Sequence, residues 1–164
     1  MHLLPYDAFI IQSREPLSEV VEKLNAQIEA PKLFRWSYSR NHAPYEGTLS
    51  SSGFEIHRII HYRNSFLPNI RGRFESSPDG TLIRITMRMH PLVTAFLVFW
   101  LLAWYSGTIP IFLVRVLSGY VTFEALLFLG LPIVLFVTFW GAFWYEANRS
   151  RRELMQIIQG ELLK

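Results

Sequence analysis

Residues 92–114 read LVTAFLVFWLLAWYSGTIPIFLV and contain no Asp, Glu, Lys, Arg or His. An α-helix rises about 1.5 Å per residue, so a run of this length crosses a hydrocarbon core of about 30 Å. A second run, VTFEALLFLGLPIVLFVTFWGAFWY at residues 121–145, is long enough to return, and its one charged residue, Glu124, lies near one end. A pair of core helices in a soluble protein would need a polar face toward water, which neither run provides. The sequence therefore predicts a transmembrane helical hairpin with these two runs as its spans.

The end of the first span has two interpretations. Gly107 and Pro110 weaken a helix, so an alternative ends the span near Ser106 and places the following residues in the membrane interface. The turn between the spans is flanked by Arg115 and Glu124. These two side chains either pair across the turn or are solvated separately at the interface.

Basic residues gather on the side of the hairpin that carries both ends of the chain. Five arginines lie near the outer ends of the two spans, against Arg115 alone in the turn: Arg84, Arg88, Arg149, Arg151 and Arg152. By the positive-inside rule, both termini should face the cytoplasm. The start of the chain, MHLLPYDAF, lacks the pattern of a cleaved signal peptide, so we expect the N-terminal part to stay on that side.

Residues 1–91 have the pattern of a small α+β domain. After a short apolar stretch, AFII, residues 13–29 place apolar side chains at helical spacing and predict an amphipathic helix. Strand-like runs follow, bounded by the turn sequences SSSG and SPDG. They occupy residues 33–38, 45–50, 53–62, 69–76 and 81–89. We expect a small antiparallel sheet with the helix on one face. Residues 146–164 predict a short amphipathic cytoplasmic helix that lies on the membrane, on the chain's own domain or on a partner.

Alternation along the last two strands gives the sheet a basic face. Ile83, Ile85, Met87 and Met89 point one way, whereas Arg71, Arg73, Arg84 and Arg88 should share the face turned away from the helix. A basic face beside a bilayer suits anionic lipid or an acidic protein surface. Nucleic acid is a weaker candidate, since the chain shows no known binding motif and its net charge is only +3. The plainer alternative is a solvated face whose arginines pair with Glu across strands.

A resemblance adds to this pattern. Residues 62–74 (YRNSFLPNIRGRF), 80–91 (GTLIRITMRMHP) and 143–154 (FWYEANRSRREL) resemble a group of uncharacterised small two-helix membrane proteins, frequent in cyanobacteria. The likeness covers roughly residues 45–155 and includes Glu146 after the second span. It implies a bacterial inner or thylakoid membrane protein and implies no particular activity. Within the first of these stretches, Tyr62, Arg63 and Phe66 surround a turn, and we expect them to contact a partner or lipid.

The sequence predicts no catalytic residues, cofactor or metal site. It shows no nucleophile motif, phosphate loop or pair of catalytic carboxylates, and without Cys it has no disulfide or thiol chemistry. His57 and His61 would lie about 13 Å apart on a strand, too far for one metal ion. We expect an accessory, assembly or stabilising subunit that docks on a membrane protein complex or anionic lipid through the basic face. The alternatives are a protein that binds lipid or an amphipathic small molecule between helix and sheet, and a membrane enzyme of unknown chemistry.

Overall fold

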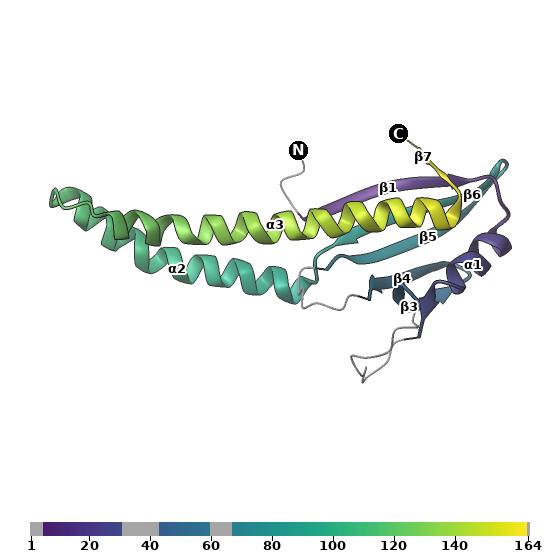
Figure 1. Cartoon of the computed structure of the whole chain (residues 1–164), viewed down its shortest axis with the longest axis horizontal. Helices are drawn as coiled ribbons and strands as arrows, with labels where there is room; N and C mark the ends of the chain where they lie inside the picture. The colour runs from purple at the N-terminus through teal and green to yellow at the C-terminus, as the bar shows by residue number, and fades with distance from the viewer. Residues whose placement is uncertain (1–4, 31–42, 60–66, 164) are drawn as a thin grey trace.

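The computed structural model describes residues 5–30, 43–59 and 67–163, which form an elongated molecule with an α+β domain at one end and a long helical hairpin at the other (Figure 1). Its elements in chain order are β1 (Tyr6–Ser13), α1 (Leu17–Asn25), β2 (Ile28–Glu29), β3 (Tyr45–Ser50), β4 (Gly53–Arg58), β5 (Asn69–Ser77), β6 (Gly80–Arg88), α2 (Pro91–Leu117), α3 (Phe123–Ile158) and β7 (Glu161–Leu163). This arrangement confirms the predicted fold class of an α+β domain followed by a helical hairpin.

The described strands form one sheet with the order β2-β3-β4-β5-β6-β1-β7. Neighbouring strands are antiparallel except for the two-residue pairing of β2 with β3, which makes the sheet mixed instead of purely antiparallel. β1 contains the AFII stretch and lies between β6 and β7, although it is not among the runs predicted to be strands. The predicted run at residues 33–38 lies outside the described residues.

The described helices cover one face of this sheet, and none of them lies on the other, which we call the open face. The covered face carries the predicted alternation, with Ile83, Ile85 and Met87 of β6 buried. Helix α1 contributes buried Val20 and Leu24. The C-terminal part of α3 adds four buried apolar side chains, from Phe143, Ala147, Leu154 and Ile158. The core therefore lies between the sheet and these two helices, and the alternate residues of each strand form the open face.

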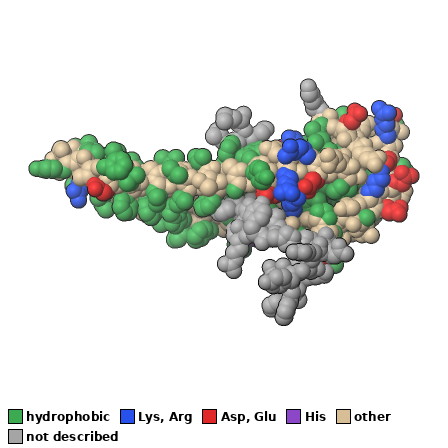
Figure 2. Space-filling view, in the orientation of Figure 1, with side chains coloured by type: hydrophobic (Ala, Val, Ile, Leu, Met, Phe, Trp, Pro, Cys, Tyr) green, Lys and Arg blue, Asp and Glu red, His purple; other side chains and the backbone are tan. Residues whose placement is uncertain are grey.

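The hairpin has the length and composition of a membrane anchor. Its helices are 27 and 36 residues long. Within the most apolar 18-residue stretch of each helix, only 6% and 11% of the stretch is buried, respectively. Most of the coloured side chains on the visible surface of the hairpin are apolar, with charged ones only near its tip and at the domain end (Figure 2), which is unlike a core helix pair in a soluble protein. Helix α2 begins at Pro91, with the His90 side chain accepting a hydrogen bond from the Leu92 N–H. It continues through Pro110 to Leu117, so the alternative end near Ser106 is wrong. Among the described residues, Arg115 and Glu124 form no ion pair with each other.

Helix α3 is continuous from the hairpin into the domain. The second span and the amphipathic tail are a single helix, Phe123–Ile158, which crosses the boundary predicted at residues 145 and 146. Past Phe143, this helix runs along the covered face of the sheet (Figure 1). Gln159 in the left-handed conformation then ends it, and β7 pairs with β1. Of the three predicted locations for the tail, the structure shows packing on the chain's own domain.

The two hairpin helices are joined by hydrogen bonds near Pro132. The indole Nε1 of Trp104 donates to the carbonyl of Phe128 at 3.0 Å, and the hydroxyl of Tyr105 donates to the carbonyl of Leu129 at 3.0 Å. Pro132 has no N–H and so cannot supply the usual helical partner of the Phe128 carbonyl. Trp104 of α2 satisfies the backbone group that this proline leaves without a helical donor.

Candidate functional site

The four predicted arginines of the sheet lie on its open face. Arg71 and Arg73 come from β5, Arg84 and Arg88 come from β6, and all four are exposed. The strand register places Arg73 directly opposite Arg84, which confirms that the two pairs share one face. Arg88 lies at the end of β6 next to the hairpin. The other predicted contact residues, Tyr62, Arg63 and Phe66, lie outside the described residues.

Two of these arginines are neutralised by carboxylates of the same face. A guanidinium nitrogen of Arg71 lies 2.8 Å from Glu55, and Nε of Arg84 lies 2.6 Å from Glu75. The hydrogen bonds from Arg71 and from Asn69 hold the pKa of the Glu55 carboxyl below the ordinary glutamate value. The solvated-face alternative therefore accounts for Arg71 and Arg84.

The other two arginines are less compensated than Arg71 and Arg84, although the charge of Arg88 also helps to lower the pKa of the Glu55 carboxyl. Within the described part of the chain, Arg73 and Arg88 form no ion pair. Arg73 also faces Arg84 across the strands, and like charges in that position are unfavourable. The part of the open face on β5 and β6 therefore carries more arginines than carboxylates.

An apolar strip borders the arginines on the open face. It consists of Tyr6, Ala8 and Ile10 of β1 together with Leu163 of β7. Tyr6 is 48% exposed and Leu163 is 44% exposed. The register pairs Tyr6 with Arg88 and Ile10 with Arg84, so the strip and the basic residues are adjacent rows. Next to the hairpin, the open face thus combines a basic half on β5 and β6 with an apolar half on β1 and β7. Farther from the hairpin, the apolar row ends at Gln12 and Glu161.

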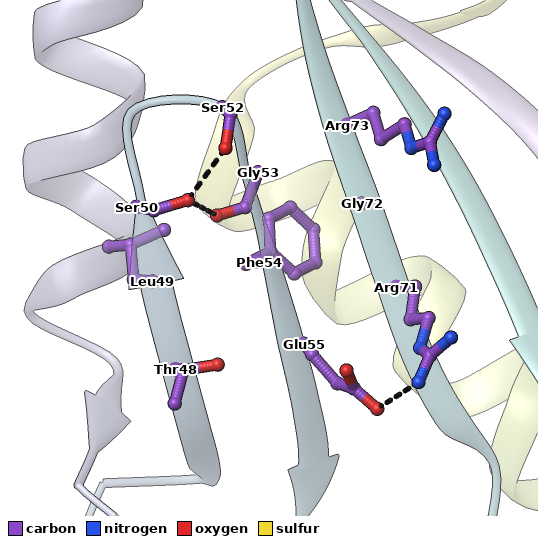
Figure 3. A pocket seen from close by; sticks show the side chains of 10 residues that line it. All are labelled: Thr48, Leu49, Ser50, Ser52, Gly53, Phe54, Glu55, Arg71, Gly72 and Arg73. Atoms are coloured by element: carbon purple, nitrogen blue, oxygen red, sulfur yellow. Dashed lines mark hydrogen bonds and ion pairs between the residues drawn. The ribbon is translucent and has the colours of Figure 1, made fainter.

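A hollow of about 610 Å³ lies between the β3–β4 turn and β5 (Figure 3). Most of its polar groups already bond to one another: the Ser50 hydroxyl lies 2.9 Å from the Gly53 carbonyl and 3.0 Å from the Ser52 hydroxyl. Glu55 and Arg71 form their ion pair at its lower end, and Arg73 extends away from the turn. Of the described charged residues that line the hollow, Arg73 is therefore the one without an ion pair.

A buried charge cluster joins α3 to the sheet, and the sequence analysis did not find it. Arg58 of β4 lies between two carboxylates of α3, 2.8 Å from Glu153 and 3.9 Å from Glu146. Glu146 is 1% exposed. The hydroxyl of Tyr45 donates to Glu153 at 3.1 Å, and burial, together with this negative charge, raises the pKa of the Tyr45 phenol. The clue in the sequence is Arg58 itself, a cation that interrupts an otherwise apolar strand face.

The described residues form no group of three or more His, Asp or Glu side chains placed to hold a metal ion. Their buried charges lie in two places: Arg58 with Glu146 between β4 and α3, and Asp7 of β1, which lies 3.6 Å from Arg151 of α3. Comparison of the chain with protein-family models, curated proteins and solved structures gives no match to any of them. The resemblance to cyanobacterial membrane proteins therefore stays a prediction, and the function has to be argued from the geometry.

Proposed function

We propose that this chain is a non-catalytic accessory, assembly or stabilising subunit that is anchored by its hairpin and docks on a membrane protein through the open face of its sheet. The observation that carries the proposal is the placement of this face along the axis of the hairpin. Helix α3 runs from the hairpin along the sheet without interruption, and the central strands follow about the same direction (Figure 1). With the hairpin in a bilayer, the sheet stands upright on the membrane.

An upright sheet favours a protein partner over a lipid surface. β6 leads directly into α2, so Arg88 lies close to the headgroup layer. Arg84 is four residues further along the strand, which places it about 13 Å farther from the membrane, and Arg73 lies at the same level. Headgroups can reach the end near Arg88, whereas a neighbouring protein that rises from the bilayer can contact the whole face.

The two halves of the face indicate the chemistry of the partner. Tyr and Arg are, with Trp, enriched among the residues that contribute most of the binding energy at protein interfaces. Arg73 and Arg88 have no ion pair in the described structure and can form charge-assisted hydrogen bonds with carboxylates. Tyr6 and Leu163 can pack on an apolar patch. The partner surface should therefore carry an apolar patch flanked by Asp or Glu.

The proposal also includes the side of the membrane on which the sheet domain lies. The basic residues at the domain end of the hairpin favour a cytoplasmic domain with both termini on that side. The resemblance described above favours the bacterial inner or thylakoid membrane.

Lipid binding between helix and sheet has less support. Ser13 of β1 donates from its hydroxyl to the carbonyl of Ile158 in α3 at 3.2 Å. A Cβ added to Gly160 would lie 2.3 Å from the Ile11 side chain. These contacts pack the end of α3 directly on β1, which supports docking over lipid binding at this place.

The docking proposal is tested by native separation of gently solubilised membranes. We expect the full chain to migrate with a larger complex, and the double variant Arg73→Glu with Arg88→Glu to migrate at the size of the free chain. Arg152→Glu is the matched control, since Arg152 is an exposed arginine of α3 away from the open face. The proposal is wrong if the wild-type chain migrates alone, or if the double variant stays in the complex.

A second experiment separates protein docking from lipid docking. The isolated complex is transferred into nanodiscs that contain only phosphatidylcholine. A protein interface should survive this exchange. Loss of the complex in phosphatidylcholine, with recovery when anionic lipid is added, would show that headgroups hold the domain instead.

A further inference from the structure

A groove opens between α2 and α3 beside the hairpin turn, at the end of the molecule far from the sheet. Its volume is about 380 Å³, and most of its wall is apolar: Ile111, Phe112, Ala125 and Phe128. The rings of Phe128 and Trp104 stack 6.0 Å apart at 17°, which brings the two helices together on the inner side of the groove. The groove is therefore closed toward the middle of the hairpin.

The groove spans the boundary between acyl chains and headgroups. At about 1.5 Å per residue, Arg115 lies about 36 Å along α2 from Pro91. The hydrocarbon core is about 30 Å thick, and the bilayer with its headgroups is about 40–45 Å thick. With Pro91 at the near interface, Arg115 reaches the far headgroup layer, and Phe112 lies near the far edge of the hydrocarbon.

Two opposite charges stand at the mouth of this groove, one from each helix. Both Arg115 and Glu124 line it, and both are exposed. In the described structure neither forms an ion pair. A turn that needed this pair for its own stability would bring the two charges together. The Glu124 carboxylate accepts hydrogen bonds from Thr122 and from its own backbone N–H at the start of α3, and a carboxylate has further acceptor positions. The guanidinium of Arg115 and these remaining positions can serve one zwitterionic ligand.

We propose that the groove binds an aminophospholipid of the far leaflet. The phosphate would bind the Arg115 guanidinium, the primary ammonium would donate hydrogen bonds to the Glu124 carboxylate, and an acyl chain would lie along Phe112 and Phe128. A glycerol headgroup has the phosphate but no cation for Glu124. A choline headgroup has a cation that cannot donate an N–H hydrogen bond. The chemistry of the mouth therefore favours phosphatidylethanolamine over phosphatidylglycerol and phosphatidylcholine.

Native mass spectrometry of the full chain in detergent tests this preference. The protein is mixed with equal amounts of phosphatidylethanolamine, phosphatidylglycerol and phosphatidylcholine, each with acyl chains of a different mass. The experiment is repeated with the acyl chains assigned to other headgroups, so that an effect of chain length is separated from an effect of the headgroup. We expect phosphatidylethanolamine to be retained about fivefold more than either competitor, the ratio that one ion pair at an exposed site can support. Equal retention of the three lipids overturns the proposal without any variant.

Variants of Arg115 and Glu124 test whether these two charges cause the preference for phosphatidylethanolamine. Glu124→Gln should abolish the preference for phosphatidylethanolamine over phosphatidylglycerol, and Arg115→Gln should weaken retention of all three lipids. Arg73→Gln, on the open face, should change neither. Ala125→Leu fills the groove and leaves both charges in place, so it should lower retention of every lipid. An unchanged preference in Glu124→Gln contradicts the assignment.

A second copy of the chain is the competing occupant. Mass photometry of the protein in nanodiscs distinguishes it from lipid. One copy per disc agrees with a lipid-filled groove. Two copies in the wild type that become one copy in Ala125→Leu would show that the groove is a protein interface, and would overturn the proposal. Neither result depends on docking of the sheet, because the groove lies at the opposite end of the molecule.

Discussion

Replacement of Trp104 by Phe should destabilise the hairpin, because it removes the hydrogen-bond donor of one backbone carbonyl. The indole of Trp104 is the donor to the Phe128 carbonyl at 3.0 Å, and Pro132 cannot replace it. No water is available in the hydrocarbon core to satisfy this carbonyl. Phe keeps an aromatic ring against Phe128 but has no N–H. Because interhelical hydrogen bonds in membranes contribute about 0.6–2 kcal/mol, we expect Trp104→Phe to lower the free energy of unfolding by about 1–2 kcal/mol.

A double-mutant cycle with Pro132→Ala isolates the carbonyl. Alanine restores the backbone N–H at position 132, which can then donate to Phe128 within α3. In that background the indole is no longer needed, so Trp104→Phe should cost about 1 kcal/mol less than in the wild type. Tyr105→Phe is the matched control. Its acceptor, the carbonyl of Leu129, keeps the N–H of Ile133 as a helical donor, so its cost should not depend on position 132.

Steric trapping measures these free energies in a bilayer-like medium. The chain contains no Cys, so two introduced cysteines, one near each end of the hairpin, can carry the labels without competing thiols. Trp104→Phe should be costly in the wild type and nearly neutral with Pro132→Ala. The same cost in both backgrounds would refute the reasoning, and so would a Tyr105→Phe variant that couples to Pro132→Ala as strongly.

Three further predictions concern the sheet domain. Arg58→Met leaves two carboxylates of α3 without their buried cation and should cost about 3–5 kcal/mol in thermal or denaturant unfolding; a cost below about 1 kcal/mol would contradict this account of the cluster. Arg71→Gln should raise the pKa of Glu55 toward the ordinary value, measured by carboxyl NMR titration. Because the folded pKa is lowered, the contribution of this pair to stability is present above the unfolded pKa and is lost as the pH falls through the folded one. Gly72→Ala would place a Cβ 2.2 Å from the ring of Phe54. It should cost about 1–3 kcal/mol, and Phe54→Leu should relieve part of that cost; additive costs in the double variant would count against the clash.

The predictions that the structure confirms rest on local patterns. The hairpin follows from two apolar runs of sufficient length, the first without charge and the second with Glu124 near one end. The two faces of β6 follow from strict alternation, which has the period of a strand. β1 was missed because the run Phe9–Ile11 is apolar without alternation and because its place depends on pairing with β6, far away in the sequence. β7, with three residues, is too short for a periodic pattern.

The continuity of α3 could have been inferred from the sequence. Composition changes sharply after Tyr145, from apolar to charged, and this change suggested a separate tail. No Gly or Pro occurs between Gly141 and Gly160, however, so nothing in the sequence ends the helix at that point. The partners of Arg58 were beyond local reasoning, since Glu153 is 95 residues away in the chain. An isolated cation on an apolar strand face predicts a buried carboxylate, but not which one.

The buried cluster gives α3 one preferred position along the sheet. Apolar contacts between a helix and a sheet are non-directional, so they resist sliding only through packing. The cluster behaves differently, because Glu146 and Glu153 lie two turns apart on α3 and receive Arg58 between them. A shift of α3 by one turn would move both carboxylates about 5.4 Å and leave the charge of Arg58 buried without its partners. Since the same helix continues into the hairpin, this register and the direct connection of β6 to α2 together set how far the sheet, and with it Arg73 and Arg88, stands from the membrane. The energetic cost of burying these charges is therefore coupled to the geometry on which docking of the open face depends.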